Sequence, residues 1–522
     1  MTSGRDDRSG NDEPQHSIAI RAVPSSSALT KAPRNGVADA LLLGLAGLCY
    51  AFWLTIGRFD FWHAGSGFGL TFNSMLAHLL NGNFDVDPAI VGNEGFARDG
   101  RVYAYWGPFC AAIRLPLVLI PGGLGVDATK LSCFVAVCVA AFFKLQTLRF
   151  IVRNSAPSPL ANAMYWLLAA TLLFSGAQVE FLRASVYQEV CLWAGAQAAA
   201  FVFVAVRCIV CGRFTPPALC VMACTAGLAL LTRVSIGLGL YAALCLLLLA
   251  NLVREPAHTA DDSRPNASGG RIASTGFILP LLILSGFAAL AGFVNYQRWG
   301  DAFVFANFHL YLFNQTYPDR LTRMDSYGLF NLARIPFGIA YYFLPLWVIQ
   351  RDDGKLLFEE HQLRLIDATE LPPSSFLLSA PLLLLLAFFA LWSLTSFRRS
   401  AGIPRLQAFA IGSGLSIAGL LMLAAVSMNF RYRMEFYPLF EYFAFLGFIV
   451  LCRAPASVPY KATLRTAFAF AVVGLVWSHV VMLLYKLSAF GPPLDALRSG
   501  VYAYYLQQVQ LHFPGLASYL PR

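Results

Sequence analysis

Acidic and aromatic side chains gather in one segment, residues 82–109, of a chain that is otherwise poor in charge. The segment reads GNFDVDPAIVGNEGFARDGRVYAYWGPF. A carboxylate such as Glu94 could accept a proton from a hydroxyl group, which is the usual task of a general base. Aromatic rings could stack on a flat-faced ligand or lie in the aromatic belt of a membrane interface. The segment supplies a candidate catalytic carboxylate, Glu94, and candidate binding residues, Asp99, Tyr103, Tyr105 and Trp106. The simpler interpretation of its acids, Asp85, Asp87, Glu94 and Asp99, is that they are solvated loop residues.

Two further acids lie beside long apolar segments. Asp60, in GRFDFW, follows the first of these segments, and Glu189, in SVYQEVCLW, opens a later one. An ionised carboxylate is costly inside a membrane, so each is a candidate catalytic residue. The alternative is placement near a helix N-terminus, where the helix dipole favours negative charge. The sequence leaves both readings open.

Three arginines lie where two apolar segments meet. Arg431 and Arg433 occur in MNFRYRMEFYP, and Arg233 occurs in LALLTRVSIG. A guanidinium group suits a phosphate by charge and by bidentate hydrogen bonding, so all three are candidates for holding a phosphate. The alternatives are extension of the side chain to the interface or pairing with Glu435. Arg233 could also belong to a buried polar network.

No metal site and no cofactor motif can be identified in the sequence. No histidine pair has the spacing of zinc ligands on a helix, and no Walker motif is present. The eleven cysteines fall mainly in apolar stretches, which is typical of small buried hydrophobic residues. We therefore expect no cofactor, and the sequence does not decide whether a divalent metal takes part.

These candidates must be positioned by membrane-spanning helices. The chain has 522 residues, of which 57% are hydrophobic and 13% charged, whereas soluble domains are about one quarter charged. Backbone groups in lipid must be hydrogen-bonded internally, so the predicted fold class is an all-α, polytopic membrane protein. The net charge of +10 comes from basic residues in short loops, which orient helices and do not indicate a nucleic-acid partner. The apolar segments are 37–56, 128–150, 158–175, 188–210, 216–232, 234–253, 274–295, 376–396, 405–427, 436–452 and 464–486.

Basic residues predict which loops face the cytoplasm. If the arginine-rich loops are cytoplasmic, the ambiguous runs 108–121 and 330–349 must be interfacial or re-entrant. That gives about eleven crossings, with the N-terminus inside and the C-terminus outside. The predicted domains are a disordered cytoplasmic tail (1–36), a transmembrane domain (37–490) and an outer tail (491–522). The large loops, 57–127 and 296–375, then share the outer face.

A surface helix is expected within the first outer loop. In FGLTFNSMLAHLL, Phe68, Phe72 and Met75 recur at helical spacing. Asn81-Gly82 should end this helix. We expect its polar residues, Thr71, Asn73, Ser74 and His78, to face away from the apolar side.

The order of these features resembles the GT-C superfamily of membrane glycosyltransferases. The resemblance is to bacterial relatives of protein O-mannosyltransferases and of the aminoarabinose transferase. It covers about residues 37–490 and is carried by the acid after the first helix, the Tyr/Trp–Gly-Pro stretch, GLALLTR, VNYQRWGDAFVF and RYRMEFYPLF. It implies a glycosyltransferase of the bacterial inner membrane that uses a polyprenyl-phosphate-linked sugar. The acceptor would be a cell-envelope glycan, lipid or protein at the periplasmic face. Asp60 and Glu189 would match the family's acidic positions, and Arg431 and Arg433 the donor-phosphate site.

One departure from the family concerns the catalytic base. Where the family usually has an acid before the surface helix, this sequence has Ser66-Gly67. Either the base has moved to a position such as Asp60, or it is missing. Two alternatives therefore stand beside the transferase: a transporter or flippase of a lipid-linked or anionic solute, and a non-catalytic protein that retains the architecture. Against the transporter, no inverted repeat is evident.

Overall fold

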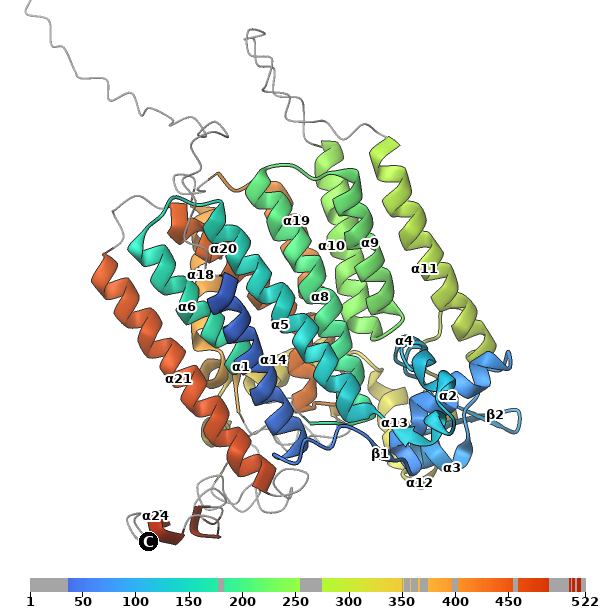
Figure 1. Cartoon of the computed structure of the whole chain (residues 1–522). Coiled ribbons are helices and arrows are strands. Elements are labelled where there is room, and N and C mark those ends of the chain that lie inside the picture. The colour runs from blue at the N-terminus through green and yellow to red at the C-terminus, as the bar shows by residue number, and fades with distance from the viewer. Residues whose placement is uncertain are drawn as a thin grey trace, which may run out of the picture.

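The computed structural model describes residues 36–176, 183–253, 275–349, 351, 357, 365–366, 374–396, 402–453, 459–487, 507, 509–511 and 514–517. The expected tail at 1–36 lies outside these residues except for Gly36, and most of 491–522 lies outside them too. The described chain forms a bundle of long apolar helices with short elements at one end (Figure 1). The prediction of an all-α membrane protein is confirmed.

Among the described residues, eight helices are long and apolar enough to cross a membrane. These candidate spans are α1 (Gly36–Thr55), α5 (Thr129–Arg153), α8 (Val186–Cys211), α10 (Val234–Val253), α11 (Thr275–Trp299), α19 (Arg405–Ala424), α21 (Tyr460–Leu487) and the stretch Phe430–Arg453, which contains α20 (Tyr437–Arg453).

Three shorter apolar helices complete the bundle, each with a proline in its first turn, where the missing N–H costs nothing. They are α6 (Pro159–Phe174), α9 (Pro216–Leu230) and α18 (Pro381–Thr395). Together with the eight long helices they would make the predicted count of eleven crossings, which stays a prediction.

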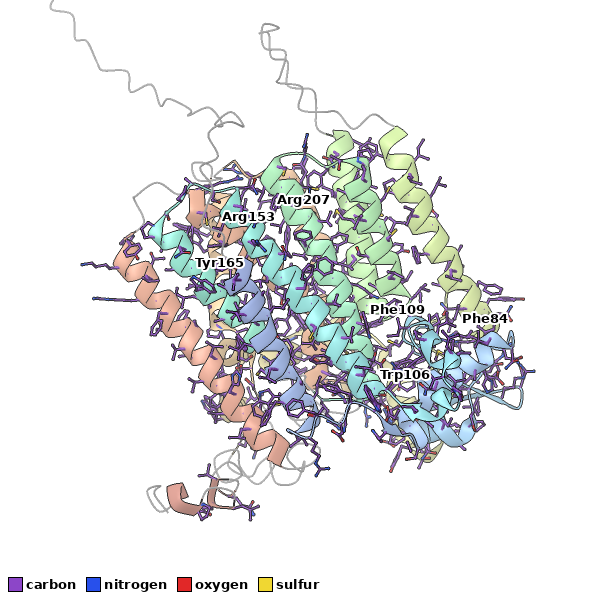
Figure 2. All side chains as sticks on the ribbon, viewed as in Figure 1. Phe84, Trp106, Phe109, Arg153, Tyr165 and Arg207 are labelled. Atoms are coloured by element: carbon purple, nitrogen blue, oxygen red, sulfur yellow. The ribbon has the colours of Figure 1, made fainter. Side chains whose placement is uncertain are left out.

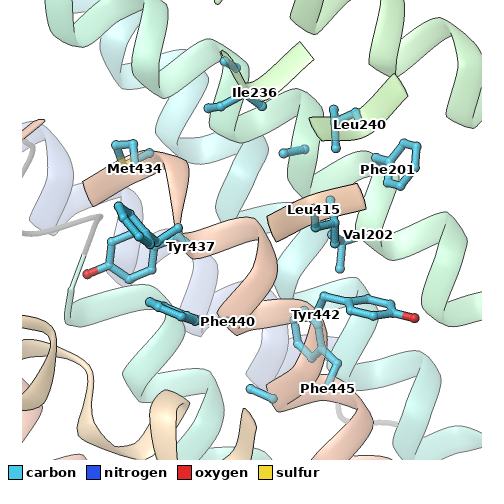
Figure 3. Close-up of a cluster of buried hydrophobic side chains, with 14 of the residues drawn as sticks. Phe201, Val202, Ile236, Leu240, Leu415, Met434, Tyr437, Phe440, Tyr442 and Phe445 are labelled. Carbon is cyan, nitrogen blue, oxygen red and sulfur yellow. The ribbon is translucent and has the colours of Figure 1, made fainter. Parts of the chain in front are cut away.

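Helix α20 occupies the centre of the bundle. In the 18-residue apolar window of Phe430–Arg453, 94% of the residues are buried, whereas the corresponding windows of α1 and α11 are 28% buried and that of α21 is 33% buried. A helix that is apolar on all sides must be surrounded by other helices. Figure 3 shows this core, in which Tyr437, Phe440, Tyr442 and Phe445 of α20 lie among side chains of α8, α10 and α19.

Small residues allow the central helices to approach closely. Helix α10 packs on α19, and α18 packs on α20. A Cβ atom added at Gly414 would lie 2.0 Å from the backbone nitrogen of Ala243, and one added at Gly447 would lie 2.3 Å from the carbonyl oxygen of Leu386. Helices in membranes associate through this kind of close backbone packing.

The first outer loop, between α1 and α5, is built from short elements. It contains two antiparallel strand pairings: β1 pairs with β4 across the base of the loop, and β2 and β3 form a hairpin. The elements, in which η denotes a 3-10 helix, are β1 (His63–Ala64), η1 (Gly67–Leu70), α2 (Thr71–Leu80), α3 (Pro88–Val91), η2 (Gly92–Glu94), β2 (Phe96–Arg98), β3 (Arg101–Tyr103), α4 (Phe109–Ala112), η3 (Leu115–Leu119), η4 (Gly123–Gly125) and β4 (Val126–Asp127).

The second long loop lies at the same end of the bundle, where α12 and α13 stand beside α2 and α3 (Figure 1). Arg153 and Arg207 lie at the opposite end from Trp106 and Phe109 (Figure 2). Which of the two ends faces the cytoplasm stays a prediction. The remaining elements are η5 (Phe308–Leu310), α12 (Leu312–Thr316), α13 (Pro318–Tyr327), η6 (Leu332–Arg334), α14 (Ile335–Phe343), α15 (Leu346–Ile349), α17 (Phe376–Ser379), η7 (Phe430–Glu435) and α24 (Pro514–Ala517).

The predicted surface helix is present, but its polar face is buried. Helix α2 ends at Leu80, and Gly82 follows with φ of 73°, as expected for a helix stop. However, Asn73 is only 2% exposed, and its amide donates to the carbonyl oxygens of Leu124 (2.9 Å) and Val126 (2.7 Å). The polar face is buried because the chain folds back over it at residues 124–126, a contact that the spacing within the helix does not reveal.

Candidate active site

Glu94 joins the two long outer loops. The Tyr311 hydroxyl donates a hydrogen bond to Glu94 Oε2 at 2.7 Å. The Tyr311 ring stacks on Phe96 at a centroid distance of 4.8 Å, and the backbone N–H of Leu312 donates to Gly95. Burial, assisted by the negative charge of Glu94, raises the pKa of Tyr311. Tyr311 therefore stays protonated at neutral pH and remains a donor to the carboxylate.

The start of α8 reaches the same carboxylate. Tyr187, on the first turn of α8, lies within electrostatic range of the Glu94 carboxylate. Its ring packs against Phe68 and Trp106, each at 5.5 Å, and the guanidinium carbon of Arg431 lies 4.3 Å from the ring centroid. An arginine over an aromatic face is held by attraction to the ring's quadrupole. Tyr187 thus holds Arg431 of η7 in the neighbourhood of Glu94.

A second arginine lies at the edge of this group. Arg233, in the turn between α9 and α10, forms an ion pair with Glu435 and lies 5.3 Å from the ring of Tyr432. Burial raises the pKa of Tyr105, which is also within electrostatic range of Arg431, Arg233 and Glu94. We call this group the Glu94 cluster. Its members are Glu94, Tyr105, Tyr187, Arg233, Tyr311, Arg431 and Tyr432.

The Glu94 cluster has the parts that a group transfer needs. Glu94, Tyr187 and Arg431 are half-buried, so they remain partly accessible to a ligand. A carboxylate can accept a proton, and arginines can stabilise charge that develops on a leaving phosphate. The described residues contain no group of three or more His, Cys, Asp or Glu side chains arranged to hold a metal ion.

Asp60 lies outside the Glu94 cluster. Its carboxylate accepts a hydrogen bond from the Lys130 ammonium at 2.7 Å, and this contact lowers the pKa of Asp60. The chain turns sharply just before it, with φ of 55° at Ile56 and 56° at Phe59, conformations that L-residues rarely adopt. A hydrogen bond from the Phe59 N–H to the Thr55 hydroxyl supports the turn. None of the contacts of Asp60 in the described structure reaches Glu94.

Glu189 is fully buried and both of its oxygens are occupied. Oε2 accepts from Arg114 at 2.8 Å and Oε1 accepts from Ser132 at 2.5 Å. Its exposed fraction is 0%. The structure therefore places Glu189 in an ion pair inside the protein, one helical turn or less from Tyr187 but not among the accessible groups.

The other predicted site residues have structural contacts. Arg433 is buried, donates to Ser379 and lies over the ring of Phe376. Asp99 is 78% exposed at the tip of the β2–β3 hairpin. Its φ of 52°, followed by 74° at Gly100, is the backbone of a tight hairpin turn, for which Asp-Gly is a favoured pair.

Two predicted aromatic residues, Tyr103 and Trp106, pack in the protein interior next to the cluster. Tyr103 packs on Trp299 at 6.0 Å, and Trp106 lies 4.6 Å from Tyr105, measured between ring centroids. The carbonyl oxygen of Trp106 accepts a hydrogen bond from Arg298 at 2.8 Å. Because both are almost fully buried, Tyr105 is the member of this aromatic stretch that is left facing the cluster.

The structure thus brings together four predicted residues, Glu94, Tyr105, Arg233 and Arg431. It adds Tyr187 and Tyr311, which sequence reasoning missed. Tyr187 could have been noticed, because it stands two residues before Glu189 at the start of the same helix. Tyr311 gave no signal, since 217 residues separate it from Glu94.

The fold and the cluster define a multi-pass helical membrane protein with a charged, aromatic site at one end of its bundle. No protein-family model matches the chain, and no curated protein sequence matches it.

The chain resembles several solved structures, three of which are the following. Two are of Archaeoglobus fulgidus: an oligosaccharyltransferase in the apo form (TM-score 0.41, 12% identity) and the oligosaccharyltransferase AglB with an inhibitory peptide and a dolichol-phosphate (TM-score 0.42, 12% identity). The alignments cover 91% and 92% of this chain and 58% and 59% of those chains, so the chain spans less than two thirds of their length.

The third is ArnT from Cupriavidus metallidurans bound to undecaprenyl phosphate. Its TM-score is 0.39 with 14% identity, over 91% of this chain and 76% of that chain. TM-scores of 0.39 to 0.42 are too low to assign an activity, or any residue's role, by correspondence.

Proposed function

We propose that this protein is a glycosyltransferase that moves a sugar from a polyprenyl-phosphate donor to an acceptor hydroxyl at the outer face of a bacterial inner membrane. The observation that carries the proposal is the Glu94 cluster. It combines one accessible carboxylate, two arginines and several tyrosines from five separate parts of the chain. A donor with a lipid tail would enter such a site from the bilayer, with its phosphate at the level of the arginines.

The proposed reaction is a single displacement. Glu94 accepts the proton of the acceptor hydroxyl while the acceptor oxygen attacks the anomeric carbon. The bond between that carbon and the phosphate oxygen breaks, and the polyprenyl phosphate leaves with the bonding electrons. Arg431, with Arg233 behind it, stabilises the negative charge that grows on the phosphate. Tyr311 holds the carboxylate in place by a hydrogen bond, and Tyr187 holds Arg431 nearby through its ring.

The donor class follows from the charges of the site and from its position at the end of an apolar bundle. Arginine suits a phosphate because its planar fork makes two parallel hydrogen bonds. Tyr105 and Tyr187 offer ring surface on which a sugar could stack. The dolichol-phosphate and undecaprenyl phosphate in two of the similar structures belong to the same class of lipid.

The proposal is tested by profiling envelope glycans and glycolipids by mass spectrometry in a strain that lacks the gene. The strain is complemented at matched expression with the wild type, Glu94→Gln or Asp319→Asn. Asp319 is the matched control because it is an outer-loop acid that is 70% exposed and pairs only weakly, with Arg323 at 3.4 Å. Loss of a general base lowers the rate by roughly 100- to 10,000-fold.

We expect one glycan to disappear in the deletion and to return with the wild type and Asp319→Asn but not with Glu94→Gln. A glycan that returns fully with Glu94→Gln would refute the role of Glu94 while keeping the transferase. No glycan change in expressing cells would refute the transferase and favour the transporter.

A further inference from the structure

A buried polar network fastens the first outer loop to the bundle next to the Glu94 cluster. The Arg114 guanidinium donates to Glu189 Oε2 at 2.8 Å and, through Nε, to Asn73 Oδ1 at 3.2 Å. Ser132 donates to Glu189 Oε1 and accepts from the indole N–H of Trp193 at 2.9 Å. The network therefore joins α2, the segment before η3, α5 and α8.

The two ends of this network carry parts of the candidate site. On α8, Tyr187 lies two residues before Glu189, on the first turn of the same helix. On the loop, Asn73 belongs to α2 and Arg114 follows α4, and the rings of Phe68 and Trp106 from this loop pack on Tyr187. The position of α8 relative to the loop therefore sets whether Tyr187 can reach Glu94.

We propose that Arg114 and Glu189 are a positioning pair, which holds the first outer loop in register with α8 so that Tyr187 meets Glu94. The inference rests on the proposed function of the Glu94 cluster. Glu189 does not touch the substrate: it is 0% exposed, and both of its oxygens are held by protein donors. It acts through Tyr187.

A buried ion pair is suited to this task more than to stability. Removing two charges from water has a cost that their attraction only partly offsets, so replacing both by apolar residues is often neutral for folding. Removing one partner is different, because it leaves a single buried charge. Comparing removal of one partner with apolar replacement of both therefore distinguishes a role in positioning the loop from a direct role of the Glu189 carboxylate in the reaction.

The test uses the full chain with Glu189→Ala, Arg114→Ala and the paired apolar variant Arg114→Met/Glu189→Leu. The control is Glu441→Ala, which removes one partner of the equally buried Lys144–Glu441 pair (2.5 Å) between α5 and α20. Two readouts are taken, normalised to folded protein. One is amide hydrogen exchange of residues 67–127 in nanodiscs, and the other is the glycan product in the complemented deletion strain.

We expect Glu189→Ala and Arg114→Ala to raise exchange across 67–127 and to lower product by about tenfold or more, because each leaves one buried partner alone. Glu441→Ala should change neither the exchange of residues 67–127 nor the amount of product by more than about twofold. The paired apolar variant should recover product to within about threefold of the wild type, because both charges are gone and the volume is kept.

Two results would overturn the proposal. If the paired apolar variant shows wild-type exchange and no product, the Glu189 carboxylate itself is required for the reaction. If Glu441→Ala raises exchange across 67–127 as much as Glu189→Ala does, the effect is general loss of stability. The exchange readout needs no activity, so it decides the positioning role even if the proposed transferase fails.

Discussion

Replacement of Arg431 should weaken the binding of a polyprenyl phosphate without unfolding the protein. Arg431 is half-buried in η7, with its guanidinium carbon 4.3 Å from the ring centroid of Tyr187. A hydrogen bond to a charged group contributes about 1.5–3 kcal/mol. Loss of one such bond in Arg431→Ala corresponds to roughly 10- to 150-fold weaker binding, since about 1.4 kcal/mol is tenfold.

A lysine at this position separates charge from geometry. Arg431→Lys keeps the positive charge but loses the second parallel hydrogen bond and the flat stacking on Tyr187. The cation–π contact alone is about 0.5–2 kcal/mol. We therefore expect Arg431→Lys to bind between the wild type and Arg431→Ala.

The assay is a native mass-spectrometric titration of the purified chain in nanodiscs with undecaprenyl phosphate. Dioleoyl phosphatidic acid is titrated in parallel to measure affinity for lipid phosphates in general. Arg101→Ala is the matched control, because Arg101 is an exposed arginine of the same face with a single long contact, to Asn83 at 3.4 Å. Undecaprenyl phosphate binding that is unchanged in Arg431→Ala, or weakened equally in Arg101→Ala, would refute the assignment.

Three further outcomes test other contacts. Tyr311→Phe removes a donor to Glu94 and should lower the glycan product roughly tenfold with an unchanged unfolding temperature; full product would show that the contact is dispensable. The Lys130 contact lowers the pKa of Asp60, so the stability of the wild type relative to Lys130→Met should be present at neutral pH and lost as acid protonates Asp60. Thermal unfolding measured as a function of pH should show a stability difference between the two proteins of less than about 1 kcal/mol, because the pair is partly exposed. A stability difference that grows in acid would contradict this expectation. Gly414→Leu should destabilise the bundle by about 1–3 kcal/mol, seen as a lower unfolding temperature, because its Cβ would lie 2.0 Å from the backbone of α10; an unchanged temperature would contradict the close packing.

The membrane made the helices predictable. Lipid leaves backbone groups only internal partners, so long apolar runs had to be helices. The structure begins α6 and α9 at Pro159 and Pro216, within one residue of the predicted apolar segments, whereas the segment 376–396 is divided into α17 and α18, which begins at Pro381. The clustering of arginines likewise predicted that the large loops share one end of the bundle.

The partners of the charged residues could not be predicted. Arg114 and Glu189 are 75 residues apart, Arg233 and Glu435 are 202 apart, and Glu94 and Tyr311 are 217 apart. Spacing within a helix or loop carries no information about such contacts, which depend on how distant segments pack. The buried polar face of α2 has the same cause, since residues 124–126 cover it from beyond the helix.

The kind of partner that each glutamate has favours Glu94 as the proton acceptor. Glu189, Glu435 and Glu441 lie against Arg114, Arg233 and Lys144, each as a buried ion pair. Protonating any of these acids would leave its cation buried without a counter-charge, which is costly. Within the described part of the chain Glu94 forms no ion pair, and its hydrogen bond comes from the neutral hydroxyl of Tyr311. Protonation of Glu94 therefore breaks no ion pair in the described structure, which is consistent with the proposed role of Glu94 as proton acceptor.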